Sequence, residues 1–492
     1  MTAQFPFDNS YARLPDRFFT RTKPTPIACP KLVRLNQDLA LDLGLDPDWL
    51  ASAEGVETLA GQRVPDTSEP IAMAYAGHQF GHFVPQLGDG RAILLGEVID
   101  RRGIRRDIQL KGSGPTPFSR RGDGRAALGP VLREYVVSEA MAALGIPTTR
   151  ALAAVTTGEW VARDTLLPGA VLTRVAPSHI RIGTFQFFAA RGDVEGLRLL
   201  ADHVITRHYP HVADHKEPYR ALLDEVIARQ ASLVAQWLLI GFIHGVMNTD
   251  NMSVAGETID YGPCAFMDAY DPATVFSSID QQGRYAFGNQ PRIALWNLTR
   301  LAEAILPLLA EDGDRAVALA QDSLGAFVAQ FNAAYQAGLR RKLGLSVERD
   351  GDGALAQDLL DAMAENRADF TLTFRHLCGA AAGPEGDEAV SRLFQDPSAY
   401  DRWAVRWRAR LDEEPQGSGM RRKAMAAVNP AYIPRNHRVE AMIRAAVDRD
   451  DFGRFEELLS VLSGPYEDSP DFAAYAEPPA PNERVRWTFC GT

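Results

Sequence analysis

Cysteine is scarce in this chain, and the few cysteines are too far apart for the sites that depend on them. The 492 residues include four, at positions 29, 264, 378 and 490, and no Cys-x-x-Cys pair occurs. Structural zinc sites and disulfide-stapled small domains need closely spaced cysteines. The pattern therefore argues against both classes, and Cys490, the third residue from the end, is interpreted as an exposed thiol with no assigned role.

Long apolar runs are also lacking. The longest, residues 233–247, is interrupted by Gln236, Gly241 and His244, so it is too short and too mixed to cross a membrane. The N-terminal segment has early acidic residues and lacks the apolar stretch of a signal peptide. We therefore expect a cytoplasmic protein without a membrane partner.

Positive charge is in short supply over the chain as a whole. Lys and Arg number 52 against 63 Asp and Glu, a formal net charge of -11. Proteins that bind nucleic acid usually present a basic face. Residues 101–125 are a local exception, with seven Arg and one Lys against two Asp. This segment has little of the aromatic interleaving that single-strand binding uses, so we expect no nucleic-acid partner; the residues alone leave a solvated hairpin or an RNA patch open.

Two motifs of hydrolytic enzymes are absent. The sequence contains neither H-E-x-x-H nor G-x-S-x-G. Four histidines fall close together, but their spacings of five, three and four residues do not match a zinc motif. We interpret them as surface or capping residues; they are His203, His208, His211 and His215.

The hydrophobic pattern predicts a small β-rich region followed by a large helical one. A helix is expected near residues 35–43, and another over 128–144, where Gly145 and Pro147 end it. Segments with the i, i+3, i+4 pattern dominate from residue 192 onward. The expected strands are 91–99, 107–112 and 170–176, and the later helices are 192–209, 217–243 and 292–310, with more over 345–470.

One stretch, HGVMNTDNMSVAGETIDYGP at 244–263, is similar to the catalytic loop of a protein kinase. Such a loop reads H-R-D-x-x-x-x-N and is followed by D-F-G. His244 and Asn251 fit the first and last positions, and Asp260 begins a D-Y-G triplet, but Val246 occupies the place of the catalytic Asp. Asp250 is the candidate base, displaced by four positions; a turn or cap role is the alternative for a loop Asp.

The segment between these motifs predicts a hairpin with Ala255-Gly256 as its turn. That register places Asn251 opposite Asp260, with Cβ atoms about 5 Å apart. An amide oxygen and a carboxylate at this separation can share one metal ion. An Asn and an Asp that merely cap an ordinary hairpin remain the alternative.

Upstream residues supply candidate phosphate ligands. Five glycines fall within 77–98, and loops of this kind bring backbone N–H groups against phosphates, although a plain β-turn is also compatible with Gly88 and Gly90. Lys111 ends a predicted strand and Glu134 lies on the following helix, as in a kinase ion pair. Two arginines follow whose planar forks suit phosphate oxygens, Arg174 and Arg181.

Three long stretches strongly resemble the selenoprotein O family. They begin KGSGPTPFSRRGDGRAALGPVLREY at Lys111, HGVMNTDNMSVAGETIDYGPCAFMDAY at His244 and QGRYAFGNQP at Gln282, and the likeness extends over most of the chain. The resemblance implies an α+β, bilobal protein-kinase-like fold with a small β-rich lobe and a large helical lobe. It divides the chain into an N-terminal extension (1–70), the small lobe (71–185), the large lobe (186–345) and a helical C-terminal extension (346–492).

The family resemblance also implies an activity and a set of site residues. The family transfers AMP from ATP, bound in a flipped orientation, to Ser, Thr or Tyr hydroxyls of proteins. Asp250 would then accept the proton, Asn251 and Asp260 would hold Mg²⁺ or Mn²⁺, and Glu134 would pair with Lys111. The implied nucleotide-binding residues are Gly88, Gly90, Arg91, Lys111, Asp123, Gly124, Arg174, Arg181 and Asp260.

The resemblance extends to partners and regulation. The implied acceptors are redox-related proteins, including the chain itself. Cys490 occupies the place of the selenocysteine of eukaryotic members, where a disulfide could gate activity; whether Cys264 reaches it stays open. Three other functions remain: a uridylyltransferase using UTP and Mn²⁺, a γ-phosphate kinase, which Val246 disfavours, and an ATP-binding scaffold without activity.

Overall fold

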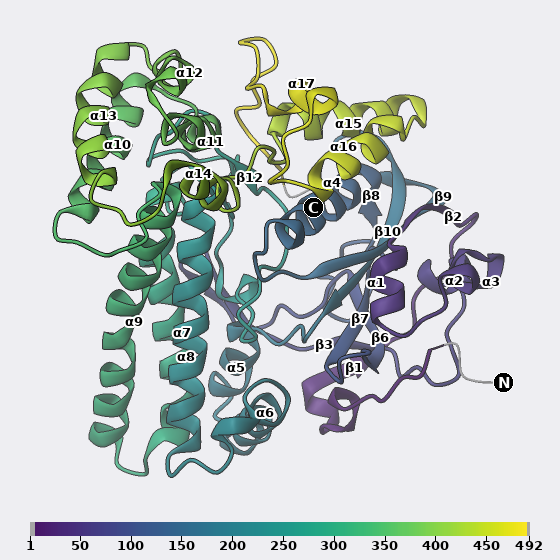
Figure 1. Ribbon diagram of the computed structural model, residues 1–492. Coiled ribbons are helices and arrows are strands. Elements are labelled where there is room, and N and C mark those ends of the chain that lie inside the picture. Colours follow the sequence, from purple (N-terminus) through teal and green to yellow (C-terminus); the bar gives the residue numbers. More distant parts are fainter. Residues whose placement is uncertain (1–4, 490–492) are drawn as a thin grey trace.

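A computed structural model describes residues 5–489, and it places a β-sheet with its covering helices beside a larger helical part (Figure 1). The α+β class expected from the sequence is confirmed. Cys490 lies outside the described residues, so the structure does not test its predicted role. None of the helices described is long and apolar enough to cross a membrane.

The sheet has eight strands, and all its pairings are antiparallel. Both edge strands come from the N-terminal segment, which is therefore built into the sheet. The three strands predicted from the sequence are confirmed as β6, β7 and β10. In spatial order the strands are β1 (Phe19–Arg21), β3 (Ile71–Met73), β6 (Ala92–Ile99), β7 (Arg105–Lys111), β10 (Leu166–Ala176), β9 (Arg150–Ala162) and β2 (Lys31–Leu35), and β8 (Ala126–Ala127) pairs with β10.

Strand β7 shows how the sheet separates its core from the polar groups of the site. Successive side chains of a strand point to opposite faces. Ile108 packs with Leu39 and Val155 in an apolar cluster beneath the N-terminal helices. Gln109 and Lys111 therefore face the other side, where both are buried among polar partners. The helices over the apolar face are α1 (Gln37–Asp42), α2 (Pro47–Ala51) and α3 (Ala53–Leu59).

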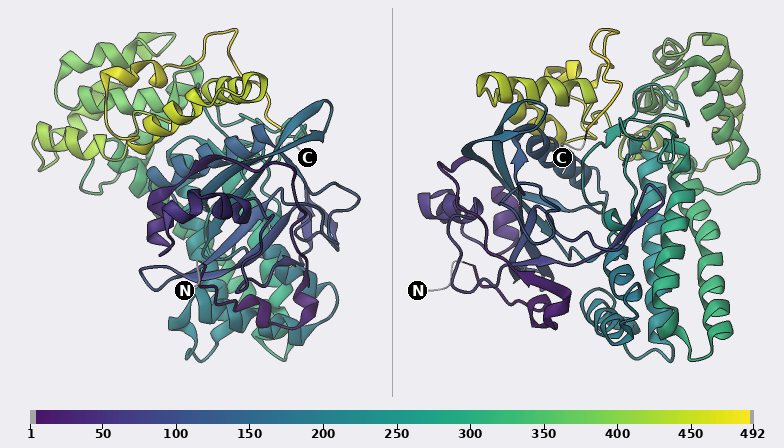
Figure 2. Two further views of the ribbon diagram at one scale, coloured as in Figure 1. Left: turned by 90° about the vertical axis from the view of Figure 1, so that its right-hand side faces the viewer. Right: turned by 180° about the vertical axis from the view of Figure 1, so that it is seen from behind.

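Helix α4 (Leu128–Ala143) lies between the sheet and the C-terminal helices (Figures 1 and 2). It ends where predicted, because Gly145 adopts a left-handed φ of 77° and closes the last turn. Tyr135 on α4 packs edge-on against Phe455, with ring centroids 5.5 Å apart. The helices that cover α4 in this way are α15 (Asn436–Arg449) and α16 (Gly453–Ser463).

The rest of the chain is mainly helical, as the periodic pattern predicts. In α9 the N-cap Asp312 accepts a hydrogen bond from the backbone N–H of Arg315, and three basic residues in the last turn complement the helix dipole. Helices α7, α8 and α9 lie side by side (Figure 1). The helices are α5 (Ile182–Ala189), α6 (Val194–His208), α7 (Pro218–Leu239), α8 (Gln290–Leu309), α9 (Gly313–Lys342), α10 (Asp352–Asn366), α11 (Phe370–Ala380), α12 (Asp387–Ser391), α13 (Pro397–Leu411), α14 (Ser418–Ala426) and α17 (Ala473–Ala476).

The hairpin predicted between Asn251 and Asp260 is wrong. A turn does form, because the N–H of Gly256 donates to the carbonyl of Ser253, but its two arms do not pair with each other. Instead, Ser253 in the first arm forms an isolated β-bridge with Arg181, and Thr258 in the second arm forms one with residue 148. Backbone groups elsewhere in the fold thus satisfy both arms, and local alternation could not reveal this competition.

Candidate active site

A buried ion-pair network joins the sheet, helix α4 and the D-Y-G triplet. Lys111, at the end of β7, lies with its Nζ atom 2.5 Å from a carboxylate oxygen of Glu134 on α4. Arg174 on β10 donates to the other oxygen of Glu134 and, over 2.5 Å, to Asp260. Register explains the grouping, because Arg174 pairs with Gln109, two residues from Lys111 on the same face of the sheet.

The carboxyl groups of this network are held in their ionised form. Burial alone would raise the pKa of Glu134, but Arg174 and Lys111 outweigh it, so its pKa is lowered. Burial opposes ionisation of Asp260 too, yet Arg174, Arg181 and Lys111 hold its pKa well below the usual range. The network thus concentrates positive charge around two fixed carboxylates.

Asp260 sits at a backbone corner that is anchored from behind. Its φ is 64°, in the left-handed region that Asp adopts more readily than most residues. Behind the corner, the buried His244 ring lies 2.9 Å from the carbonyl oxygen of Ile259, and the hydroxyl of Tyr261 bonds to that of Thr148. These contacts hold the residues on either side of Asp260 in place.

Asp250 belongs to a single 3₁₀ turn, η4 (Thr249–Asn251), and its carboxylate is buried. Burial raises its pKa to about 6, although the nearby Arg181 guanidinium opposes the shift. One carboxylate oxygen, Oδ2, accepts a hydrogen bond of 3.2 Å from the amide of Gln79. The other, Oδ1, has no hydrogen-bond partner among residues 5–489. A buried carboxylate with one unsatisfied oxygen is suited to accepting a proton.

Arg181 links the two acidic positions. One of its terminal nitrogens donates to the carbonyl oxygen of Asp250 and to the carboxylate of Asp260, each over 2.8 Å. Its guanidinium also stacks on the ring of Tyr75, 4.6 Å from the centroid. The geometry of the catalytic-loop segment and that of the D-Y-G corner are therefore coupled through one side chain.

A cavity of about 440 Å³ opens over these groups. Eight residues expected at a nucleotide site line it, and Val246 is in its wall as well. Further lining residues that sequence reasoning missed include Tyr75, Gln79, Asp89 and Arg120, although all but Tyr75 lie within the glycine-rich segment or the stretch that begins at Lys111. The eight expected residues are Gly90, Arg91, Lys111, Arg174, Arg181, Asp250, Asn251 and Asp260.

Three other expected nucleotide ligands do not line this cavity. Gly88 supports the loop below it: φ is 86°, and a Cβ atom there would lie 2.3 Å from the ring of Phe118. Asp123 forms an ion pair of 2.8 Å with Arg163, and Gly124 packs against the backbone of the same loop region. Their contact with a nucleotide stays a prediction.

The two metal ligands expected from the sequence, Asn251 and Asp260, each have an oxygen that could bind a metal ion. Asn251 donates its side-chain N–H to the carbonyl of Val246, which leaves the amide oxygen of Asn251 as an acceptor. The Asp260 oxygens already accept from two arginines, but each carboxylate oxygen can accept more than one partner. Residues 5–489 contain no group of three or more His, Cys, Asp or Glu side chains placed to hold a metal. Two oxygen donors beside a cation-lined cavity are compatible with Mg²⁺, which usually keeps several waters and substrate oxygens as ligands.

The four closely spaced histidines do not converge on one point. His208 bonds to Ser178, and His211 pairs with Glu225 on the surface. His215 accepts a backbone N–H from Glu217, and His203 packs on a Tyr ring. Each contact is that of a capping or packing residue.

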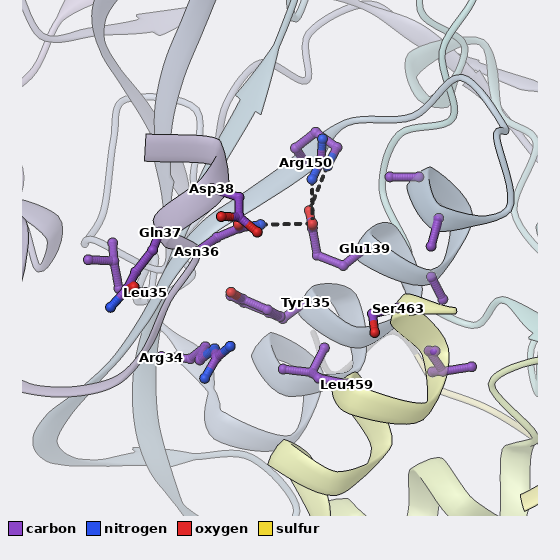
Figure 3. Close-up of a pocket in the computed structure, with 14 residues that line it drawn as sticks. Arg34, Leu35, Asn36, Gln37, Asp38, Tyr135, Glu139, Arg150, Leu459 and Ser463 are labelled. Atoms are coloured by element: carbon purple, nitrogen blue, oxygen red, sulfur yellow. Dashed lines mark hydrogen bonds and ion pairs between the residues drawn. The ribbon is translucent and has the colours of Figure 1, made fainter. Parts of the chain in front are cut away.

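A second cavity, of about 520 Å³, is lined by residues of α1, α4 and α16 (Figure 3). It is larger than the first, but its charged groups bond to one another. Glu139 accepts hydrogen bonds from Arg150 and Asn36, and Tyr135 points into the space between α1 and α16. None of the predicted site residues lines it, so the cavity over Asp250 and Asp260 is the candidate active site.

Comparison with known proteins gives a consistent result over the length of the chain. The family model described as protein adenylyltransferase SelO matches residues 2–463. A protein nucleotidyltransferase YdiU of Bradyrhizobium diazoefficiens is 70% identical over 492 residues, and the match covers 100% of both chains. Proteins of the same name from Methylorubrum extorquens, 72% identical over 498 residues, and Rhodopseudomonas palustris, 70% identical over 492 residues, are also matched over 100% of both chains.

Proposed function

The chain belongs to the SelO family of nucleotidyltransferases, and from this premise we propose that it transfers AMP from ATP to Ser, Thr or Tyr hydroxyls of proteins and releases pyrophosphate. The observation that carries the proposal is the position of the base. Asp250 presents a buried carboxylate oxygen without a partner among the described residues, in the same cavity as the cationic groups. Val246 occupies the place where a kinase base would be.

The arrangement of the site also supports a protein-kinase-like fold. In a kinase, a Lys on a strand of the small lobe pairs with a Glu on the adjoining helix. Lys111 on β7 and Glu134 on α4 are paired in this way. The sheet with α4 would then be the small lobe, and the helices from α5 to α9 the large lobe, with the cavity between them.

The chain's own residues would make two contributions to the transfer. As the oxygen of the acceptor hydroxyl attacks the α-phosphorus, Asp250 would take the proton of that hydroxyl. A pKa of about 6 leaves the Asp250 carboxylate ionised near neutral pH, so it can accept this proton. The departing pyrophosphate carries concentrated negative charge. Fixed cations in a buried site stabilise such charge as it develops; those lining the cavity are Arg91, Lys111, Arg120, Arg174 and Arg181.

Asn251 and Asp260 are the residues that would hold a divalent cation. When bound, Mg²⁺ or Mn²⁺ would supply positive charge to the triphosphate. In the flipped orientation that the family resemblance implies, the α-phosphorus of ATP would lie near Asp250 and the β- and γ-phosphates near the cations that line the cavity.

The test is pyrophosphate release with casein as acceptor, with ATP or UTP and with Mg²⁺ or Mn²⁺. The proposal expects release with ATP that is lost in Asp250→Ala. Preference for UTP with Mn²⁺ would instead make the chain a uridylyltransferase. ATP binding that needs no metal and yields no product would favour a scaffold.

A further inference from the structure

A short hairpin, β4 (Gly77–Gln79) and β5 (His82–Val84), lies against the catalytic loop. Its turn residues, Phe80 and Gly81, both adopt left-handed backbone angles, with φ of 51° and 86°. Such two-residue turns match the twist of paired strands and fix their register. On sequence alone, this segment is interpreted as part of a glycine-rich phosphate loop. In the structure it contacts the loop that carries Asp250.

Three consecutive residues of the hairpin bond three consecutive residues of the loop. Two of the bonds come from backbone N–H groups and one from a side chain. Together they leave the loop little freedom to shift, because each loop residue between 248 and 250 has its own partner. The bonds are His78 N–H to Thr249 Oγ1 (2.7 Å), Gln79 Nε2 to Asp250 Oδ2 (3.2 Å) and Phe80 N–H to Asn248 Oδ1 (3.0 Å).

The contact has support from outside the hairpin. Gln186 on α5 accepts from the hydroxyl of Thr249 over 2.6 Å, and its amide nitrogen lies 2.8 Å from a ring nitrogen of His78. The hydroxyl of Tyr285 donates to the same Asn248 oxygen over 2.7 Å. A supporting shell of this kind holds catalytic groups to the accuracy that proton transfer needs.

The Asp250 carboxylate is confined on both of its oxygens. Oδ2 accepts from Gln79, while Oδ1 faces the backbone of Gly77. A Cβ atom at position 77 would lie 2.6 Å from Oδ1, closer than real Cβ contacts allow. Any residue other than glycine at position 77 would force Oδ1 of Asp250 to move.

We propose that Gln79 is a positioning residue for AMP transfer: its amide fixes the Asp250 carboxylate through Oδ2 and so presents Oδ1 as the oxygen that accepts the acceptor's proton. The inference rests on the proposed function and specifies how its base is oriented. Gln79 acts through Asp250, and Gly77 provides the space that this orientation requires.

The kinetic test compares Gln79→Met, which keeps the length of the side chain but cannot donate, with His82→Ala on the facing strand, whose side chain is exposed and outside the cavity lining. We expect kcat for AMP incorporation into casein to fall about 10- to 100-fold in Gln79→Met, because small misplacements of a reacting group are costly. KM for ATP should stay within about 2-fold, since the cations are untouched. His82→Ala should match the wild type.

Gly77→Ala is the second variant, because it disturbs Asp250 from the opposite side, and the same loss in kcat alone is expected. A kcat within about 2-fold of the wild type in Gln79→Met, or a rise in KM for ATP that accounts for the whole loss, would overturn the inference.

Crystal structures of the wild type and Gln79→Met separate this inference from the proposed function. A rotated or doubled Asp250 carboxylate in the variant supports the positioning role whatever the activity is. An unchanged carboxylate contradicts it. Absence of Asp250-dependent AMP transfer in the wild type would instead refute the proposed function.

Discussion

Arg181 donates to the carboxylate of Asp260 over 2.8 Å while it also holds the main chain of Asp250. One guanidinium thus sets the distance between the residue proposed as base and the residue proposed as metal ligand. Because all three groups are at least largely buried, a change in one should be felt by the others.

The first prediction concerns the stability that Arg181 contributes. Arg181→Met should lower the free energy of unfolding by about 2 kcal/mol, the loss expected for hydrogen bonds to charged groups. Asp260 keeps Arg174 and Lys111, so the full cost of an unpaired buried charge is not reached. Urea unfolding measures the change. Arg392→Met is the control: its pair with Glu388 is about 70% exposed on both sides and should contribute under about 0.5 kcal/mol. Equal effects would contradict the role given to Arg181.

The second prediction concerns Glu134 and nucleotide affinity. Glu134→Gln removes the charge that holds Lys111 and Arg174 in place, so the Kd for ATP should rise about 10-fold, the equivalent of one charge-assisted hydrogen bond. Calorimetry in an Asp250→Ala background avoids turnover. The control is Glu440→Gln. It removes the ion-pair partner of Arg133, the neighbour of Glu134 on α4, and Glu440 does not line the cavity. This variant should leave the Kd for ATP unchanged. An unaltered Kd in Glu134→Gln would show that the pair does not organise the site.

The third prediction concerns pH and Glu257, which lies beyond the turn that follows Asn251. Burial raises the pKa of Glu257 to about 8, with Arg106, Arg150 and Arg229 opposing the shift. The pKa in the unfolded chain is the ordinary 4.5. Stability from this residue is therefore present below pH 4.5 and is lost progressively as pH rises towards about 8, because only the unfolded state gives up its proton in that window.

Glu257→Gln should flatten this dependence. The measurement is the urea midpoint of the wild type and the variant at about pH 5 and about pH 8.5, where the variant should gain relative stability at the higher value. A parallel dependence in both proteins would mean that Glu257 ionises normally in the fold.

The fourth prediction concerns the C-terminal helices. Phe455 on α16 is fully buried against Tyr135 of α4, so Phe455→Ala should cost about 3 kcal/mol of unfolding free energy. Val405→Ala, at a position that is 71% exposed on α13, should change it by less than about 0.5 kcal/mol. If the two variants behave alike, α16 does not stabilise the sheet region.

Much of the frame could be predicted from sequence because its signals are local. Strand β7 and helix α4 show clear periodicity, and they place Lys111 and Glu134 where the ion pair forms. Strands β1 and β2 were missed, since three and five residues are too few for a periodic signal and their pairing partners lie far along the chain.

The predicted hairpin and the surroundings of Asp250 depend on contacts between residues that are far apart in the sequence, so local patterns could not predict them. Alternation suggested that residues 252 to 259 pair with themselves, yet other segments satisfy their backbone groups. Gln79 reaches Asp250 across 171 positions, and nothing near either residue in sequence indicates the contact. Only the tertiary fold brings them together.

The most direct test of the central claim is the position of the label that the protein transfers. The wild type and Asp250→Ala would be incubated with Mg²⁺, casein and ATP labelled on either the α- or the γ-phosphate. AMP transfer with Asp250 as base predicts protein-bound label from α-labelled ATP alone, lost in the variant. Label from γ-labelled ATP alone would make the chain a kinase and contradict both the activity and the orientation of ATP proposed for this site.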